Sequence, residues 1–469
     1  MSLNPEQLSQ SIDAFWDREI VPALIEYIKI PCKSVHFDPD WEANGHMERA
    51  RRLAVDWIEA HPLPGAVLHD LSLPGLSPLL LLEVPGATDD TVLIYGHLDK
   101  QPEMEGWHDG LGPWTPVLRD GKLYGRGGAD DGYALFAAVA ALKALEGRPL
   151  PRIVILIEFS EESGSPDLPA YLERYGHLIG SPKLVIALDS GAGDYERLWS
   201  TTSLRGLVNC VVDVRVLAET THSGIAGGIV PTSERIMRQL LDRIEDPLTG
   251  AIRLPELSAS IPEQRVQQAK GAADILGDGL LGGFSAVPGL RAVSDDPAEL
   301  ILNNSWRPTL CVVGQGGMPA IATAGNILRS RTAFKLSVRL PPSVDGEAAV
   351  AALRKALADD PPYGAEVTVE FEQAGTGWDA PALAPWLEQA TTEASETFYG
   401  KDAVYLGLGA SIPFMAMLGE QFPEAQFLIT GVLGPKSNAH GPNEFLHIPY
   451  AKKLTACVAI ILGGMGEGI

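Results

Sequence analysis

The chain has 469 residues, which is long for a single hydrophobic core and favours two domains. Hydrophobic residues make up 45% and charged residues 20%, as in ordinary globular proteins, and the formal net charge is −24. Because so acidic a chain repels phosphate backbones and anionic lipids, we expect no nucleic-acid partner and no membrane partner.

The cysteines and the N-terminal segment indicate the cellular compartment. Four cysteines are scattered along the chain without any CxxC pair, which favours buried free thiols over disulfides. The first residues, MSLNPEQLSQ, lack a basic segment followed by an apolar run, so no signal peptide is predicted. We therefore expect a cytoplasmic protein.

The first part of the chain alternates predicted helices and strands. Apolar residues recur at helical spacing over 5–29 and 46–59. Short apolar runs then predict strands at 79–84, 92–96, 153–159 and 184–188. The last three runs are apolar almost throughout, which is typical of strands buried on both faces. With a helix predicted at 133–145, the order predicts an α/β domain whose mostly parallel sheet is flanked by helices.

The pattern changes near residue 200 and returns near residue 378. A strand is predicted at 207–217 and a helix at 232–245, whereas 246–305 show little periodicity. Further strands are predicted at 310–313, 333–340 and 366–372, with a helix at 346–358. The α/β pattern then resumes, with helices at 383–398, 412–419 and 449–462 and a strand at 426–430. We therefore expect one domain formed by 1–200 and 378–469, interrupted by an α+β domain at 201–377.

Acidic and imidazole side chains follow three of the predicted strands. His97 and Asp99 come after the second strand, Glu161 and Glu162 after the third, and Asp189 after the fourth. In an open α/β sheet, ligands bind at the carboxyl ends of the strands. A lone HxD pair or two adjacent glutamates would more often be surface residues, but their joint placement at strand ends favours a functional site.

Two further residues complete a set that suits zinc. Asp130 lies in a glycine-rich turn, and His440 lies in a predicted loop far downstream. Zinc binds imidazole nitrogen and carboxylate oxygen, and a catalytic site leaves one position for water. Because neighbouring side chains diverge, one of Glu161 and Glu162 can bind metal while the other faces the water.

Nine motifs, in this order, resemble one family. They read GHLDKQP, DGKLYGRGGADDG, EESGS, ALDSG, THSG, RPTL, SVRLPP, SIP and NAHGPNE. They are similar to those of the co-catalytic dizinc family that includes carnosinase-type dipeptidases, carboxypeptidase G, aminoacylase, acetylornithine deacetylase and succinyl-diaminopimelate desuccinylase. The resemblance implies a catalytic domain with an inserted lid or dimerisation domain, and two Zn²⁺ per chain, with Mn²⁺ or Co²⁺ as alternatives.

The resemblance also implies a role for each matching residue. It implies His97 and Asp189 on one zinc, Glu162 and His440 on the other, Asp130 as the bridge, Asp99 beside His97, and Glu161 as general base. A cis peptide bond is expected after Asp130. In the inserted domain, the resemblance implies that His222 acts in the site of a partner subunit and that Asn326 lies near the oxyanion. Arg339 and Ser411 would hold the substrate carboxylate.

These roles predict a metallopeptidase of dipeptidase or carboxypeptidase type that acts as a homodimer joined through the lid. The alternatives are an N-acyl-amino-acid deacylase using the same site and an inactive binding protein. Two features depart from the dipeptidase pattern: the run 406–410 before SIP lacks charged residues, and no histidine follows Trp378 closely. A small peptide or N-acyl amino acid is the expected substrate.

Overall fold

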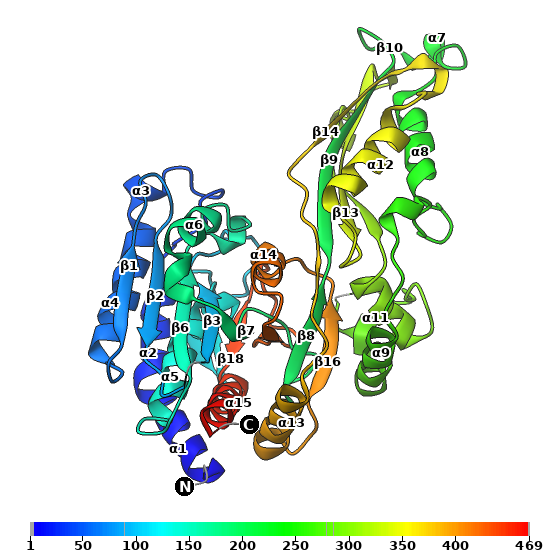
Figure 1. Cartoon of the computed structure of the whole chain (residues 1–469). Helices are drawn as coiled ribbons and strands as arrows, with labels where there is room; N and C mark the ends of the chain where they lie inside the picture. Colours follow the sequence, from blue (N-terminus) through cyan, green and yellow to red (C-terminus); the bar gives the residue numbers. More distant parts are fainter. Residues whose placement is uncertain (1–3, 89, 278, 285, 468–469) are drawn as a thin grey trace.

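The computed structural model describes residues 4–467 apart from 89, 278 and 285. Its largest sheet has nine strands, and their order is β1-β2-β6-β3-β7-β17-β8-β15, with β16 paired to β8 (Figure 1). The strands are β1 (Val67–Leu71), β2 (Leu79–Val84), β3 (Thr91–His97), β6 (Arg152–Glu158), β7 (Pro182–Ala187), β8 (Trp199–Leu204), β15 (Trp378–Asp379), β16 (Val404–Leu408) and β17 (Gln426–Ile429).

The centre of this sheet is parallel and its margins are antiparallel. The four central strands run in the same direction: β6, β3, β7 and β17. The continuous apolar runs of β3, β6 and β7 predicted such parallel strands, which are buried on both faces. β2 pairs with β6, and β17 with β8, in the opposite direction. The predicted α/β fold is confirmed, and its sheet is mixed.

Helices cover both faces of the nine-stranded sheet. On one face pack α1 (Pro5–Phe15), α2 (Val21–Ile28), α4 (His46–Ala60), α5 (Tyr133–Ala144), α13 (Pro385–Tyr399) and α15 (Ile448–Glu467). The other face is covered by α6 (Leu168–Ile179) and α14 (Pro413–Gln421). In β6 the side chains alternate, so that Ile155 and Ile157 enter the first core while Val154 and Leu156 enter the second.

The C-terminal helix α15 is apolar enough to resemble a membrane span. Its segment Ile448–Gly466 has 19 residues and a mean hydropathy of 1.3. However, 72% of the apolar stretch is buried inside the fold, and α15 packs against α5 and α13. Its sequence is therefore accounted for by its place in the core.

A separate four-stranded sheet lies between β8 and β15 in the chain. Its order is β11-β13-β9-β14, all pairs being antiparallel, and α8 (Ser233–Ile244) and α12 (Gly346–Ala358) pack on one face. The strands are β9 (Gly206–Arg215), β11 (Thr309–Gly316), β13 (Arg331–Leu340) and β14 (Glu366–Phe371). Cys311 on the edge strand β11 is exposed, which corrects the expectation that all four thiols are buried; the other three are buried.

Two helices occupy the stretch that showed little periodicity. α9 (Glu263–Leu276) and α11 (Pro297–Ser305) pack against each other and against β16 of the nine-stranded sheet. The buried side of α9 is formed by Arg265, Ala269, Ala272 and Ala273 rather than by large aliphatic residues. The sequence of α9 therefore lacks a helical repeat of large apolar residues, although the helix is well packed.

Two small sheets position two of the loops. β5 (Lys122–Tyr124) pairs with β18 (Phe445–His447) and with β4 (Val117–Arg119). β10 (Thr221–His222) pairs with β12 (Ile327–Leu328), and Figure 1 shows β10 and the short helix α7 (Ser223–Ala226) at the end of the four-stranded sheet remote from the nine-stranded one.

Candidate metal centre

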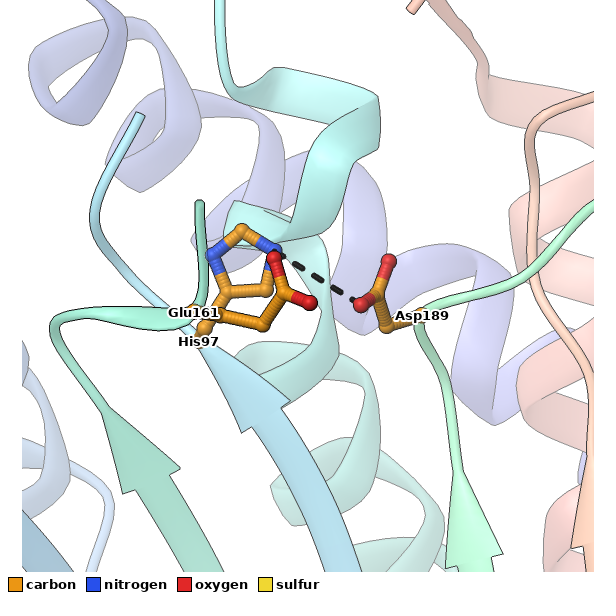
Figure 2. Close-up of side chains that lie close together, drawn as sticks. All are labelled: His97, Glu161 and Asp189. Atoms are coloured by element: carbon orange, nitrogen blue, oxygen red, sulfur yellow. Dashed lines mark ion pairs between the residues drawn. The ribbon is translucent and has the colours of Figure 1, made fainter. Parts of the chain in front are cut away.

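Three neighbouring strands end at one edge of the sheet and carry the predicted acidic and imidazole side chains. β3 ends at His97, which is paired in register with Glu158 at the end of β6. The chain leaving β6 forms the 3-10 turn Glu161–Ser163, and the chain leaving β7 continues to Asp189. Figure 2 shows the side chains of His97, Glu161 and Asp189 gathered at this edge.

Asp130 and His440 reach the same edge from other parts of the chain. Asp130 lies in the tight turn Gly128–Gly132 in front of α5, and its peptide bond to Asp131 is cis, as expected. His440 lies in the loop before β18 and has a positive φ of 63°. Because β18 pairs with β5, the His440 loop is held beside the glycine-rich turn.

A buried ion pair joins these two loops directly. Arg126 Nη1 lies 2.6 Å from Glu444 Oε2, and both side chains are almost completely buried. The other oxygen of Glu444 accepts a hydrogen bond from the backbone N–H of Gly127 at 2.9 Å. Both residues lie within motifs of the family, but the resemblance implied no role for this pair. Its sequence signal is a charged residue in each of two glycine-containing loops, which is too common to be informative alone.

Asp99 connects His97 to the acidic turn. Its Oδ1 lies 3.3 Å from His97 Nδ1, and its two oxygens accept hydrogen bonds from the backbone N–H groups of Glu161 and Glu162 at 3.1 and 2.9 Å. Both His97 and Asp99 are fully buried. A carboxylate beside Nδ1 leaves Nε2 of the ring directed toward the site, as in metal-binding histidines.

Three carboxylates face the free nitrogen of His97. Nε2 lies 3.6 Å from Asp130 Oδ1, 3.8 Å from Asp189 Oδ2 and 3.9 Å from Glu161 Oε2. These separations are too long for hydrogen bonds, and the buried Nε2 atom has no hydrogen-bond partner within the described chain. Two ligand atoms on one tetrahedral zinc, each about 2.0–2.2 Å from it, lie about 3.4 Å apart. The spacing therefore fits a shared metal ion.

The second oxygen of Asp130 faces the other histidine. His440 Nε2 lies 3.0 Å from Asp130 Oδ2 and 3.2 Å from Glu162 Oε2. Gln101 Nε2 also donates to Glu162 Oε2, at 2.6 Å, whereas Glu162 Oε1 is buried without a partner among the described residues. Asp130 thus has one oxygen toward each histidine, which is the arrangement of a carboxylate that bridges two metal ions.

The electrostatics of this edge indicate an excess of negative charge. Burial, followed by the charge of Asp189, raises the pKa of Glu161 well above its usual range, and burial is also the main cause that raises the pKa of Asp189 to about 7. For Asp130, the effect of burial is outweighed by the nearby imidazoles of His440 and His97, which hold its pKa below the usual range. Crowded buried carboxylates of this kind are stabilised by bound cations.

The predicted carboxylate-binding residues meet where the two large sheets join. Arg339 on β13 donates from Nη1 to Ser411 Oγ at 2.9 Å, and the Ser411 hydroxyl donates to the backbone oxygen of Arg205. Arg205 itself is buried and donates to Gly409 O and Thr309 Oγ1. Sequence reasoning missed Arg205, because an arginine between two strands has no distinguishing pattern.

His222 and Asn326 lie together at a different place. Both are exposed, and Ser223 N donates to the backbone oxygen of Asn326 at 3.0 Å. Among the described residues, the ring of His222 accepts only a local hydrogen bond, from Gly224 N to Nδ1. Since β10 lies at the remote end of the small sheet, this chain does not bring His222 to its own metal centre (Figure 1).

An α/β fold that gathers two imidazoles and several carboxylates at its strand ends defines a candidate metal-dependent hydrolase. The model of the peptidase family M20/M25/M40 matches residues 93–463, a stretch that contains every residue of the centre. The chain therefore belongs to this family and is a peptidase, which confirms the resemblance recognised from the motifs.

Several relatives cover most of the chain. The Cysteinylglycine-S-conjugate dipeptidase of Corynebacterium striatum is 24% identical over 436 residues, covering 89% of this chain and 91% of the relative. Beta-Ala-His dipeptidase of Homo sapiens is 27% identical over 449 residues, covering 90% and 85%. Among solved structures, the di-peptidase Dug1p of Saccharomyces cerevisiae matches with a TM-score of 0.80 at 21% identity, covering 100% of both chains.

Proposed function

We propose that this peptidase is a dizinc dipeptidase that cleaves the amide bond of dipeptides or short peptides with a free C-terminal carboxylate. The observation that carries the proposal is the position of Asp130 between His97 and His440, with one oxygen toward each. Relatives that bear dipeptidase names over most of the chain's length support the substrate class.

The proposed assignments follow the two groups of side chains. His97 and Asp189 would hold one zinc, Glu162 and His440 would hold the other, and Asp130 would serve both. Zinc ions held by these residues would supply Lewis acidity, which lowers the pKa of a bound water molecule and polarises a carbonyl group.

Glu161 acts as the general base in this proposal. Its carboxylate accepts a proton from the attacking water and then donates it to the leaving amine. The raised pKa of Glu161, caused first by burial and then by Asp189, suits a group that must both take and release a proton. Asp99 holds the backbone N–H groups of Glu161 and Glu162 and so fixes their directions.

The carboxylate end of the substrate would be held by Arg339 with Ser411. The guanidinium of Arg339 is partly buried and has no carboxylate partner within the described chain, so a substrate carboxylate can pair with it. Burial lowers the pKa of Arg339, which is the direction expected for a cation that lacks a compensating anion.

We further propose that residues 201–377 form a lid through which two chains pair. β11 is an edge strand, and Val312 and Val313 on it are 46% and 58% exposed. At the remote end, Ile225, Ile229 and Ile321 are 73%, 81% and 96% exposed. An uncovered edge with apolar side chains favours association, and a two-fold pair would let each His222 and Asn326 enter the partner's site.

A substrate panel on zinc-loaded protein tests the proposed activity. The panel compares dipeptides with a free carboxylate, the same dipeptides as C-terminal amides, and N-acyl amino acids. We expect the free dipeptides to give the highest kcat/KM. Preference for N-acyl amino acids would replace the dipeptidase proposal with a deacylase, and absence of any amide hydrolysis by protein with full metal content would refute it.

A further inference from the structure

A third glutamate lies directly beneath the acidic turn. Glu158 is the last residue of β6, and its side chain points to the same face as Val154 and Leu156, so a carboxylate continues a row of core aliphatic residues. It is only 2% exposed. No lysine, arginine or histidine of the described chain forms an ion pair with it, so the carboxylate relies on neutral donors.

Within the described part of the chain, the side-chain donors to this buried carboxylate are hydroxyl groups. Tyr95 donates to Oε1 at 2.7 Å, Ser165 donates to Oε1 at 2.8 Å and Ser160 donates to Oε2 at 3.2 Å. All three donors are themselves almost fully buried. Burial, followed by the charge of Asp99, raises the pKa of Glu158 to about 7. A buried carboxyl group is costly, and a merely space-filling role would be served better by an aliphatic side chain.

The two serines stand at the two ends of the turn that carries Glu161 and Glu162. The N–H of Ser165 donates to the backbone oxygen of Ser160 at 3.0 Å, which closes the turn. Ser165 has a φ of 54°, a left-handed conformation that few residues other than glycine adopt. Its hydroxyl bond to Glu158 therefore holds a strained position, and the bond from Ser160 holds the other end.

We propose that Glu158 is a positioning residue that fixes the direction of the Glu161 carboxylate by clamping both ends of its turn through Ser160 and Ser165. Asp99 holds the middle of the same turn through the backbone N–H groups of Glu161 and Glu162, so the two acids restrain different parts of it. This inference rests on the proposed role of Glu161. Displacement of a catalytic group by about 1 Å can cost about 10²-fold in rate.

Two of the donors provide a matched pair of variants. Ser165→Ala and Tyr95→Phe each remove one hydroxyl that donates to the same oxygen of Glu158 at nearly the same distance. Only Ser165 belongs to the turn, whereas Tyr95 lies in β3 and its ring stays stacked on Phe414. A purely structural role of Glu158 predicts equal consequences for the two variants.

We expect Ser165→Ala to lower kcat about tenfold with KM and zinc stoichiometry unchanged, and Tyr95→Phe to stay within about twofold of the parent. Glu158→Gln, which keeps an acceptor for both short bonds, should also remain active, whereas Glu158→Leu should lose about 10²-fold in kcat. Equal kcat values for Ser165→Ala and Tyr95→Phe, at matched melting temperatures, would overturn the proposal. If Glu158→Leu fails to fold, this pair still decides the question.

The same measurements separate this inference from the proposed function. If the parent protein hydrolyses dipeptides and Glu161→Gln abolishes this activity, the general-base role is established. The kcat values of Ser165→Ala and Tyr95→Phe can then be compared for this reaction. Inactive parent protein, or active Glu161→Gln, would refute the general-base assignment and the positioning role together. Active parent protein with a normal Ser165→Ala variant would refute the positioning role alone.

Discussion

The strand-end site and the remote end of the four-stranded sheet carry different residues of the proposed active site. These residues differ in their burial and in their hydrogen bonds. At the strand ends, His97 and Asp99 are fully buried, and Asp99 is bonded to the backbone of the acidic turn. At the remote end, His222 is exposed, and its ring accepts a hydrogen bond from the neighbouring Gly224 N. The comparison indicates that the strand-end site is preorganised by its own chain, whereas the proposed pairing would be needed to enclose His222.

The sharpest test of the preorganised side is Glu161→Gln. We expect both zinc ions to be retained and kcat to fall by roughly 10²–10⁴, the usual contribution of a general base. Zinc stoichiometry and kcat are measured on the same preparation, with Glu173→Gln, an exposed acid on α6, as the control. Near-normal kcat in Glu161→Gln would remove this residue from the mechanism.

The other side of the comparison is tested by His222→Ala. Loss of an oxyanion donor costs on the order of 10²–10³ in kcat, and we expect a loss of this size although His222 lies far from the metal centre of its own chain. Exposed His177 on α6 provides the control, since His177→Ala should leave kcat unchanged.

Subunit mixing distinguishes action in the partner from action in the same chain. Inactive Glu161→Gln chains are combined with His222→Ala chains and allowed to exchange. If His222 acts across the interface, a mixed dimer contains one site with both residues intact, and activity reappears. Continued inactivity after demonstrated exchange would show that His222 does not act in the partner's site.

The junction between the two sheets should give an intermediate effect. Arg339→Ala removes a charge-assisted hydrogen bond, so we expect kcat/KM for free dipeptides to fall roughly 10- to 100-fold. Dipeptide amides should be little affected, because they lack the carboxylate. Arg331→Ala on the same strand β13, where the side chain pairs with Asp213, is the control. An equal loss for amides and free dipeptides would refute the carboxylate contact.

The residues that the sequence placed after apolar strands do lie together at one edge of the sheet, because their signals are local and chemical. Continuous apolar runs marked β3, β6 and β7, and each was followed by an acid or imidazole. By contrast, β8 has the sequence WSTTSL yet is buried along its whole length, so its hydroxyl groups concealed a core strand. Glu158 was missed for a related reason: only the structure shows that three hydroxyl groups converge on it.

Stability should depend on pH in the region that is crowded with buried acids. Burial is the main cause that raises the pKa of Glu158, Glu444 and Asp189 to about 7. In the unfolded chain such groups lose their protons near pH 4, so between about pH 4 and pH 7 the folded state holds more protons. The free energy of unfolding of metal-free protein therefore falls as the pH rises through this window.

Thermal unfolding of metal-free protein at about pH 5 and about pH 8 measures this effect, and we expect the lower melting temperature at pH 8. Asp130 changes the free energy of unfolding in the opposite direction, but its lowered pKa confines that change to more acidic conditions.

Zinc should raise the melting temperature more at pH 8 than at pH 5, because deprotonated carboxylates and imidazoles bind it and the cation offsets their repulsion. Glu158→Gln should reduce the pH dependence, since it removes one of the titrating groups without changing its shape. If metal-free protein were more stable at pH 8 than at pH 5, this would contradict the view that the buried carboxylates at this edge repel one another when no cation is bound.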